Sequence, residues 1–285
     1  MNSDFTNNDS ISYIIEQYFN INMVYQHGKN NHQIGMSRRE MAIKMAARFN
    51  IVTPTLIARL FGTSKRQSLE FLNKLVKEKL LILVHTHRSV DNRVYTLSYD
   101  GAKFAVELMK VNIYYRTIKK PGMRVNQNTI MHDAMNAYIC MKFMQEEDAD
   151  QLPIYKGLLT DSEFKRIYKN TQRNVDGLLR TTNGELIAIE MEASFKSPVT
   201  RKSILIKWLE GIKHGCYQKI FIISNSEDIF KDIKRIHDQL FEDMTTRHDK
   251  KTRKPLLTND DAELLKSAII FRTKYCQELN QLFYP

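Results

Sequence analysis

Cysteine, proline, glycine and tryptophan are scarce in this 285-residue chain, which has 3, 6, 10 and 1 of them. The low glycine and proline content excludes collagen-like and low-complexity chains. Cys140, Cys216 and Cys276 are scattered, which predicts neither a disulfide framework nor a zinc site but free thiols in a reducing compartment. No apolar run approaches the ~18 residues of a membrane span, and the polar N-terminus lacks a secretion signal. We therefore expect a cytoplasmic protein without a membrane segment.

The remaining composition is that of a globular protein, with 42% hydrophobic and 26% charged residues. The length suggests two domains, since one domain takes about 150 residues. Changes in composition divide the chain into an Asn-rich N-terminal arm (1–35), a first domain (36–120) and a second domain (121–285).

Charge is distributed unevenly between these parts. The net charge is +11, and residues 36–120 hold 17 Lys and Arg against 6 Asp and Glu. Residues 121–285 are nearly balanced, with 25 against 23. A basic first domain indicates a polyanionic partner, most often nucleic acid, although a generally basic proteome would produce the same bias.

The first domain has a clear order of elements. Gln26 to Gly35 is expected to be a flexible connection after an apolar stretch, Ile11 to Val24, that could be helix or strand. A helix with an apolar stripe follows, then a short helix capped by Thr53 with Pro54 first and Gly62 after it. A longer helix, two strands (80–84 and 94–97), a turn at Asp100-Gly101 and a last helix complete it.

This order is typical of a winged helix-turn-helix, and TPTLIARLFGTSKRQSLEFLNKLVKEKLL with VYTLSYDG resembles many bacterial winged-helix DNA-binding domains. The second long helix would place its first residues in the major groove, and the connection between the strands would contact the backbone or minor groove. The expected DNA contacts are Ser64, Lys65, Arg66 and Gln67 on the helix, and His85, His87, Arg88 and Arg93 on the wing. Winged helices also mediate protein contacts, which is the alternative.

The second domain begins after a basic linker (116–128) with a helix that Thr129 can cap. Val175 to Arg180 and Leu186 to Glu192 are predicted strands joined by an Asn183-Gly184 turn. Side chains alternate along a strand, so Glu190 and Glu192 should share a face, with Asp176 on the adjacent strand. A divalent cation would relieve the repulsion between three such carboxylates. The alternative to a metal site is that Asp176 forms a turn and that Glu190 and Glu192 lie on the solvent-exposed face of a strand.

This pattern resembles the PD-(D/E)XK nuclease core, with Asp176 as first acid and Glu190 as second. Val175 stands where the family usually has proline. Glu192 stands where it usually has lysine, and this Glu-x-Glu variant also occurs in some restriction enzymes. Lys196 could stabilise a phosphorane or orient water. A helix (198–214), a strand (219–225) and a helix (227–244) follow. The expected fold is therefore α+β or α/β in two domains, the second being a restriction-endonuclease-like mixed sheet flanked by helices.

The longer string is similar to the MOBC family of plasmid relaxases and the related replication-relaxation proteins. The similarity lies in MHDAMNAYI, VDGLL and IAIEMEASFKSPVTRKSILIKW. It implies a relaxase that nicks one strand at a plasmid origin for mobilisation or replication, with Mg²⁺ or Mn²⁺ on Asp176, Glu190 and Glu192. It also implies DNA and an accessory mobilisation or coupling protein as partners. His132, where such sequences have a histidine, would be a ligand, proton carrier or phosphate contact, or else a structural histidine. Arg201 and Lys202 would contact phosphate or lie on a solvated helix face.

Several alternatives stay open at this point. The nucleophile could be water or one of 13 tyrosines, among them Tyr114, Tyr115 and Tyr217, of which none is favoured. The basic stretch 245–255 could follow DNA or be a loop. The main alternative is a DNA-binding replication or transcription regulator with a degenerate nuclease domain. A third is a hydrolytic nuclease that cuts both strands.

Overall fold

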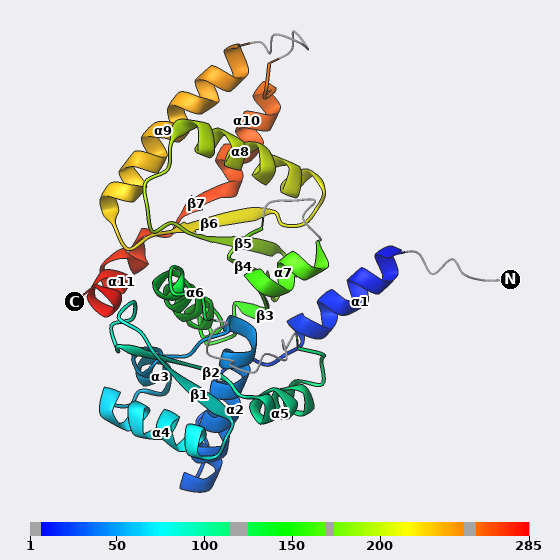
Figure 1. Cartoon of the computed structure of the whole chain (residues 1–285). Helices are drawn as coiled ribbons and strands as arrows, with labels where there is room; N and C mark the ends of the chain where they lie inside the picture. Colours follow the sequence, from blue (N-terminus) through cyan, green and yellow to red (C-terminus); the bar gives the residue numbers. More distant parts are fainter. Residues whose placement is uncertain (1–6, 114–124, 169–173, 248–254, 285) are drawn as a thin grey trace, which may run out of the picture.

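A computed structural model describes residues 7–113, 125–168, 174–247 and 255–284 (Figure 1). The predicted linker falls largely outside these ranges, as do Tyr114, Tyr115 and residues 248–254 of the second basic stretch. Within the described part, no helix combines the length and the apolar character that crossing a membrane requires.

The elements of the N-terminal part follow the predicted order of three helices, a hairpin and a helix. They are preceded by a further helix, and their bounds are α1 Asn7–Phe19, α2 Asn31–Phe49, α3 Pro54–Phe61, α4 Lys65–Lys77, β1 Leu81–His85, β2 Arg93–Leu97 and α5 Tyr99–Met109. The local signals for α3 are confirmed: the Thr53 side chain accepts a hydrogen bond from the Leu56 amide, and Gly62 ends the helix at a φ of 62°.

Two sequence-based expectations are wrong in this part. Gln26 to Gly35 is not a single flexible connection, because Asn30 caps α2 by accepting from the Gln33 amide, so that helix begins at Asn31. Asp100-Gly101 is not a turn but the first turn of α5, which Ser98 caps. Glycine is required at 101 because an added Cβ would lie 1.9 Å from the Leu80 carbonyl oxygen.

The C-terminal part carries the larger sheet. Its elements are α6 Ile130–Phe143, β3 Tyr155–Thr160, α7 Asp161–Ile167, β4 Gly177–Thr181, β5 Leu186–Met191, α8 Pro198–Lys213, β6 Lys219–Ile223, α9 Glu227–Thr246, α10 Asn259–Ala268, β7 Ile269–Phe271 and α11 Cys276–Phe283. The predicted β4–β5 hairpin is present, with Gly184 at a φ of 88° in its turn. The strands β3 and β7 were not expected.

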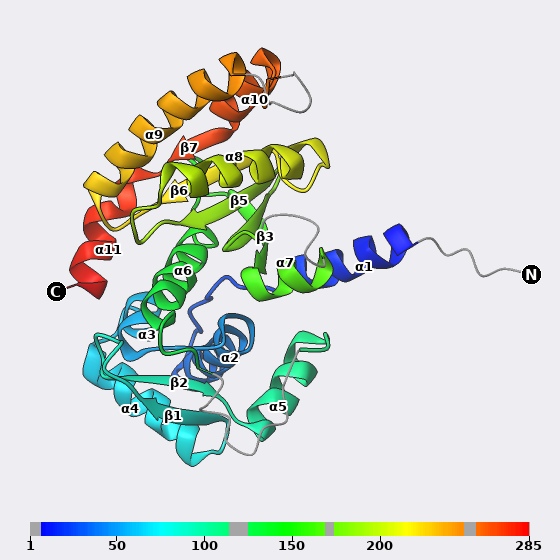
Figure 2. The same cartoon turned by 45° about the horizontal axis from the view of Figure 1, so that its top comes forward.

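The five strands lie in the order β3-β4-β5-β6-β7. The first three are antiparallel to one another, whereas β6 runs parallel to β5 and β7 parallel to β6. Figures 1 and 2 show α6 on the side of the sheet that faces the N-terminal part and α8 on the other side. The fold is thus mixed α+β, with a sheet covered by helices on both faces.

The two parts are packed together rather than joined by a linker alone. α2 and α3 contact α6, and α1 packs along β3, where a Cβ on Gly157 would lie 2.7 Å from Phe19 Cδ1. Arg48 of α2 is buried and donates to both carboxylate oxygens of Glu163 in α7, from Nε (2.9 Å) and from Nη2 (2.7 Å). This buried bidentate pair ties the N-terminal helices to the edge of the large sheet.

Candidate functional site

The first turn of α4 presents polar side chains to solvent. Ser64, Lys65, Arg66 and Gln67 are all exposed, as expected of a surface that reads DNA. Ser64 and Gln67 also form a capping box, in which Gln67 Oε1 accepts from the Ser64 amide (3.0 Å) and hydroxyl (3.1 Å). Because reading adenine takes both ends of a glutamine amide, Gln67 is not free for that role while it caps the helix.

The β1–β2 connection is fastened to this turn through Asp91. The Asp91 side chain, which is 1% exposed, lies 2.7 Å from Lys65 Nζ. It also accepts hydrogen bonds from the Thr55 amide (3.0 Å) and hydroxyl (2.9 Å) at the start of α3. One carboxylate therefore sets the positions of α3, α4 and the β1–β2 connection relative to one another.

The expected wing residues differ in their exposure. His85, His87 and Arg88 are exposed, whereas Arg93 is half-buried and its Nε donates to the Asp91 carbonyl oxygen (3.3 Å). Thr86 at the base of the wing donates to Gln127 Oε1 (2.6 Å), just before α6. Arg88 is thus the accessible wing arginine, and Arg93 has a structural contact.

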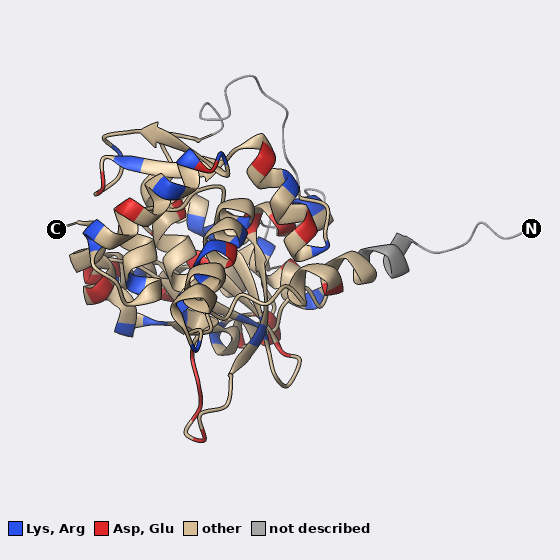
Figure 3. Ribbon diagram, turned by 90° about the horizontal axis from the view of Figure 1, so that it is seen from below, with Lys and Arg blue, Asp and Glu red and all other residues tan. Residues whose placement is uncertain are grey.

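In the part of the chain that the structure describes, Lys and Arg residues are spread over several elements. In the ribbon seen from below in Figure 3, their positions alternate with those of Asp and Glu. Arg66 illustrates this, because it is 88% exposed yet pairs with Glu70 at 3.0 Å. Such exposed pairs contribute only about 0–1 kcal/mol, so a phosphate can replace the carboxylate.

Glu190 in β5 and Glu192 directly after that strand face α8 and are buried. Glu190 is 2% exposed and accepts from Trp208 Nε1 at 2.8 Å. Glu192 is fully buried, and its two oxygens contact Arg201 Nη1 (2.7 Å) and Lys196 Nζ (2.5 Å). Lys196 and Arg201 therefore balance the charge of Glu192.

These contacts change the roles expected of the α8 cations. Arg201 is fully buried, so the expectation that it contacts DNA is wrong for this structure. The ion pair with Glu192 explains why Arg201 can be buried, because a charged side chain in the interior needs an opposite charge beside it. Lys202 is half-buried on the same helix.

Asp176 lies at the end of the sheet nearest α6. Its Oδ2 accepts from the Met191 amide (2.7 Å) and lies 3.6 Å from His132 Nε2. His132 also pairs with Asp133 (Nδ1 to Oδ1, 3.6 Å). Burial opposes protonation of His132, but its contacts with Asp133 and Asp176 raise its pKa to about 10. The imidazole is therefore a cation at neutral pH.

A further carboxylate, Asp161 at the start of α7, belongs to this neighbourhood. Desolvation and the charges of Asp176 and Asp133 raise the pKa of Asp161 to about 6. Neither Asp161 nor Asp133 was among the site residues expected from the sequence. The apolar run before Asp161 and the Thr160/Glu163 capping box could have revealed the strand and helix that place it.

The three predicted metal ligands do not form one group. Glu190 and Glu192 contact α8, whereas Asp176 turns toward α6. Within the ranges that the structure describes, no cluster of three or more His, Cys, Asp or Glu is arranged to hold a metal ion. The donor set does not fit the expected Mg²⁺ or Mn²⁺, because both oxygens of Glu192 already contact cationic side chains.

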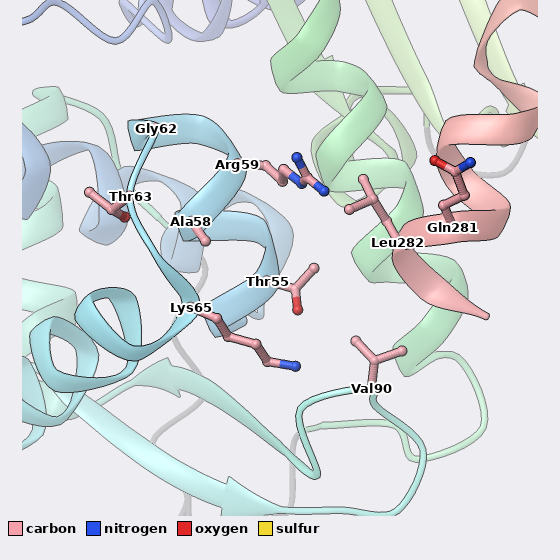
Figure 4. Close-up of a pocket in the computed structure, with 9 residues that line it drawn as sticks. All are labelled: Thr55, Ala58, Arg59, Gly62, Thr63, Lys65, Val90, Gln281 and Leu282. Carbon is pink, nitrogen blue, oxygen red and sulfur yellow. The ribbon is translucent and has the colours of Figure 1, made fainter. Parts of the chain in front are cut away.

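A pocket of about 460 Å³ lies between the two parts of the chain (Figure 4). One wall is formed by α3 and the start of α4, with Thr55, Arg59 and Lys65, and the wing adds Val90. The opposite wall is α11, with Gln281 and Leu282. The first turn of α4 therefore borders a cavity shared with the C-terminal helix.

Comparison of the chain with protein-family models, curated proteins and solved structures finds no match.

Proposed function

We propose that this chain is a double-stranded DNA-binding protein in which α2 to α5 form a winged helix-turn-helix. In this proposal α4 is the recognition helix, and the β1–β2 connection is the wing. The observation that carries it is the exposed first turn of α4, with Lys65 and Arg66, held beside the wing by buried Asp91. Lys and Arg at this position can contact phosphates or guanine.

The second domain supports a regulator better than a nuclease. Its mixed sheet keeps the hairpin, helix and strand order expected of a restriction-endonuclease-like core. Glu190 and Glu192 at the end of β5, however, are buried and bound to Trp208, Arg201 and Lys196. We infer that they hold α8 on the sheet and that the protein acts by binding, for example in control of replication or transcription.

A second candidate function is DNA nicking of the relaxase type at Asp176. The observation that favours it is that His132 lies 3.6 Å from both Asp133 and Asp176. Desolvation, and then the charges of Asp176 and Asp133, also raise the pKa of Asp161. Perturbed titratable groups of this kind occur at functional sites more often than elsewhere.

Two assays test these proposals together. Anisotropy of a labelled duplex measures binding with and without Mg²⁺, and a supercoiled plasmid measures nicking with Mg²⁺ or Mn²⁺. The regulator predicts metal-independent binding and unchanged supercoils. Open circles produced by the wild type but not by Asp176→Asn, which keeps the size of the side chain, would establish the nicking enzyme instead. Absence of duplex binding would contradict both.

A further inference from the structure

The pocket beside α4 has an electrostatic character that suits a polyanion. Arg59 is exposed and, of the residues that the structure describes, none forms an ion pair with it. Lys65 is 58% exposed in its pair with Asp91. Among the described residues that line the pocket, none is Asp or Glu. Figure 4 shows Arg59 extending toward the α11 wall.

The α11 wall holds one acidic residue, Glu278. It accepts from the Tyr138 hydroxyl and from Lys142 Nζ (3.1 Å) of α6, and it also attracts Arg59 electrostatically without forming an ion pair with it. The α11 side chain that borders the pocket is instead Gln281, which is exposed and uncharged. A glutamine amide can donate to phosphate oxygens.

We propose that the sugar–phosphate backbone of the bound duplex passes through this pocket, so that α11 forms a second wall of the DNA-binding surface. Arg59 and Lys65 contact the phosphates from one side and Gln281 from the other. The proposal rests on the proposed DNA binding and extends it to the C-terminal domain. The first turn of α4 adds backbone N–H groups and a helix dipole that favour phosphate at the same place.

This arrangement gives the C-terminal domain a direct role in binding. In a separate winged helix, the recognition helix and wing would be the whole interface. Here α11 approaches the same length of backbone, so docking of the duplex depends on the spacing between α3 and α11. In this proposal the pocket takes the backbone of one strand, while the bases are left to α4.

The test uses the full chain and a fluorescein-labelled duplex, with dissociation constants measured over a series of salt concentrations. Arg59→Gln should weaken binding about five- to tenfold near 0.1 M salt and reduce the slope of log K against log salt by about 0.9, the value for one phosphate contact. Gln281→Glu should weaken binding, and Gln281→Arg should tighten it and increase the slope by about 0.9. A gain of affinity cannot result from misfolding.

Gln239 on α9 provides the matched control. It is exposed, lies outside the pocket, and already accepts from Arg235, so Gln239→Glu and Gln239→Arg change the net charge equally elsewhere. Both controls should leave affinity and slope within error of the wild type. If the Gln281 variants behave like the Gln239 variants while Arg66→Gln still abolishes binding, this inference is overturned. The proposed function would then remain intact. A wild type that does not bind duplex would overturn both.

Discussion

Arg48 and Glu163 form a fully desolvated ion pair across the boundary between the N-terminal helices and the large sheet, with side chains 0% and 5% exposed. The guanidinium contacts both carboxylate oxygens, and Glu163 Oε2 also accepts from the Thr160 amide (2.9 Å). The Glu163 carboxylate thus binds Arg48 of α2 and also caps the N-terminus of α7. The pair fixes the position of α2 relative to α7 and the large sheet, which matters if both parts contact the same DNA.

Glu163→Gln should destabilise the protein by about 3–5 kcal/mol, because it leaves the charge of Arg48 buried without a counter-charge. Chemical denaturation followed by the fluorescence of the single tryptophan, Trp208, measures this. Glu185→Gln is the matched control, because Glu185 pairs with Lys219 at the surface and should contribute about 0–1 kcal/mol. Equal effects of the two substitutions would contradict the structural role of Glu163.

Asp91→Asn should distinguish the structural role of the Asp91 hydrogen bonds from the effect of its charge on Lys65. The amide keeps the size of the side chain but weakens its hydrogen bonds to Thr55 and its pair with Lys65, so we expect a loss of about 1–3 kcal/mol in unfolding free energy. Because Lys65 is then released, binding to duplex of arbitrary sequence should become tighter. Weaker binding with unchanged stability would show that Asp91 does not hold Lys65 in the free protein.

Glu192→Gln distinguishes a structural acid from a metal ligand. Removing its charge leaves Arg201 buried without a full counter-charge, which should reduce stability by about 3–5 kcal/mol. Thermal unfolding of the wild type should be unaffected by millimolar Mg²⁺. A melting temperature that rises with Mg²⁺ in the wild type but not in Glu192→Gln would instead make Glu192 a ligand.

The pH dependence of stability should carry a signature of His237. Burial, and then the charge of Arg201, lower its pKa from 6.5 to about 3. The folded state therefore keeps this imidazole neutral, so its contribution is complete above pH 6.5 and is lost as the pH falls toward 3. The slope reaches about 1.4 kcal/mol per pH unit for one such group. Comparing wild type with His237→Gln between pH 7 and 4 isolates it; parallel curves would contradict the burial of a neutral His237.

Local signals in the sequence were sufficient for α3, for the start of α4 and for the β4–β5 hairpin. Thr53, Pro54, Gly62 and Ser64 mark the ends of α3 and the start of α4, and each acts through contacts within a few residues. The Asn183-Gly184 turn identified the hairpin for the same reason. Such features need no knowledge of the tertiary structure.

The remaining features depend on residues far apart in the chain. Arg48 lies on a helix with an apolar stripe and gives no sign that its partner is Glu163, 115 residues later. Glu190 and Glu192 were expected on one face of a strand, and both do contact α8. That this face is covered, and that Arg201 is buried beneath it, follows only from the packing of α8. The pattern that predicts a metal site is therefore compatible with a buried ion pair.

The most direct test of the account compares Arg66→Gln with Arg235→Gln in duplex-binding titrations over a range of salt concentrations. Both arginines are exposed, both lie on helices, and both pair with an acid of their own helix, Glu70 or Asp232. The account predicts that Arg66→Gln lowers affinity and reduces the salt slope by about 0.9, whereas Arg235→Gln changes neither. Equal affinities and slopes for the two variants would contradict DNA binding through α4.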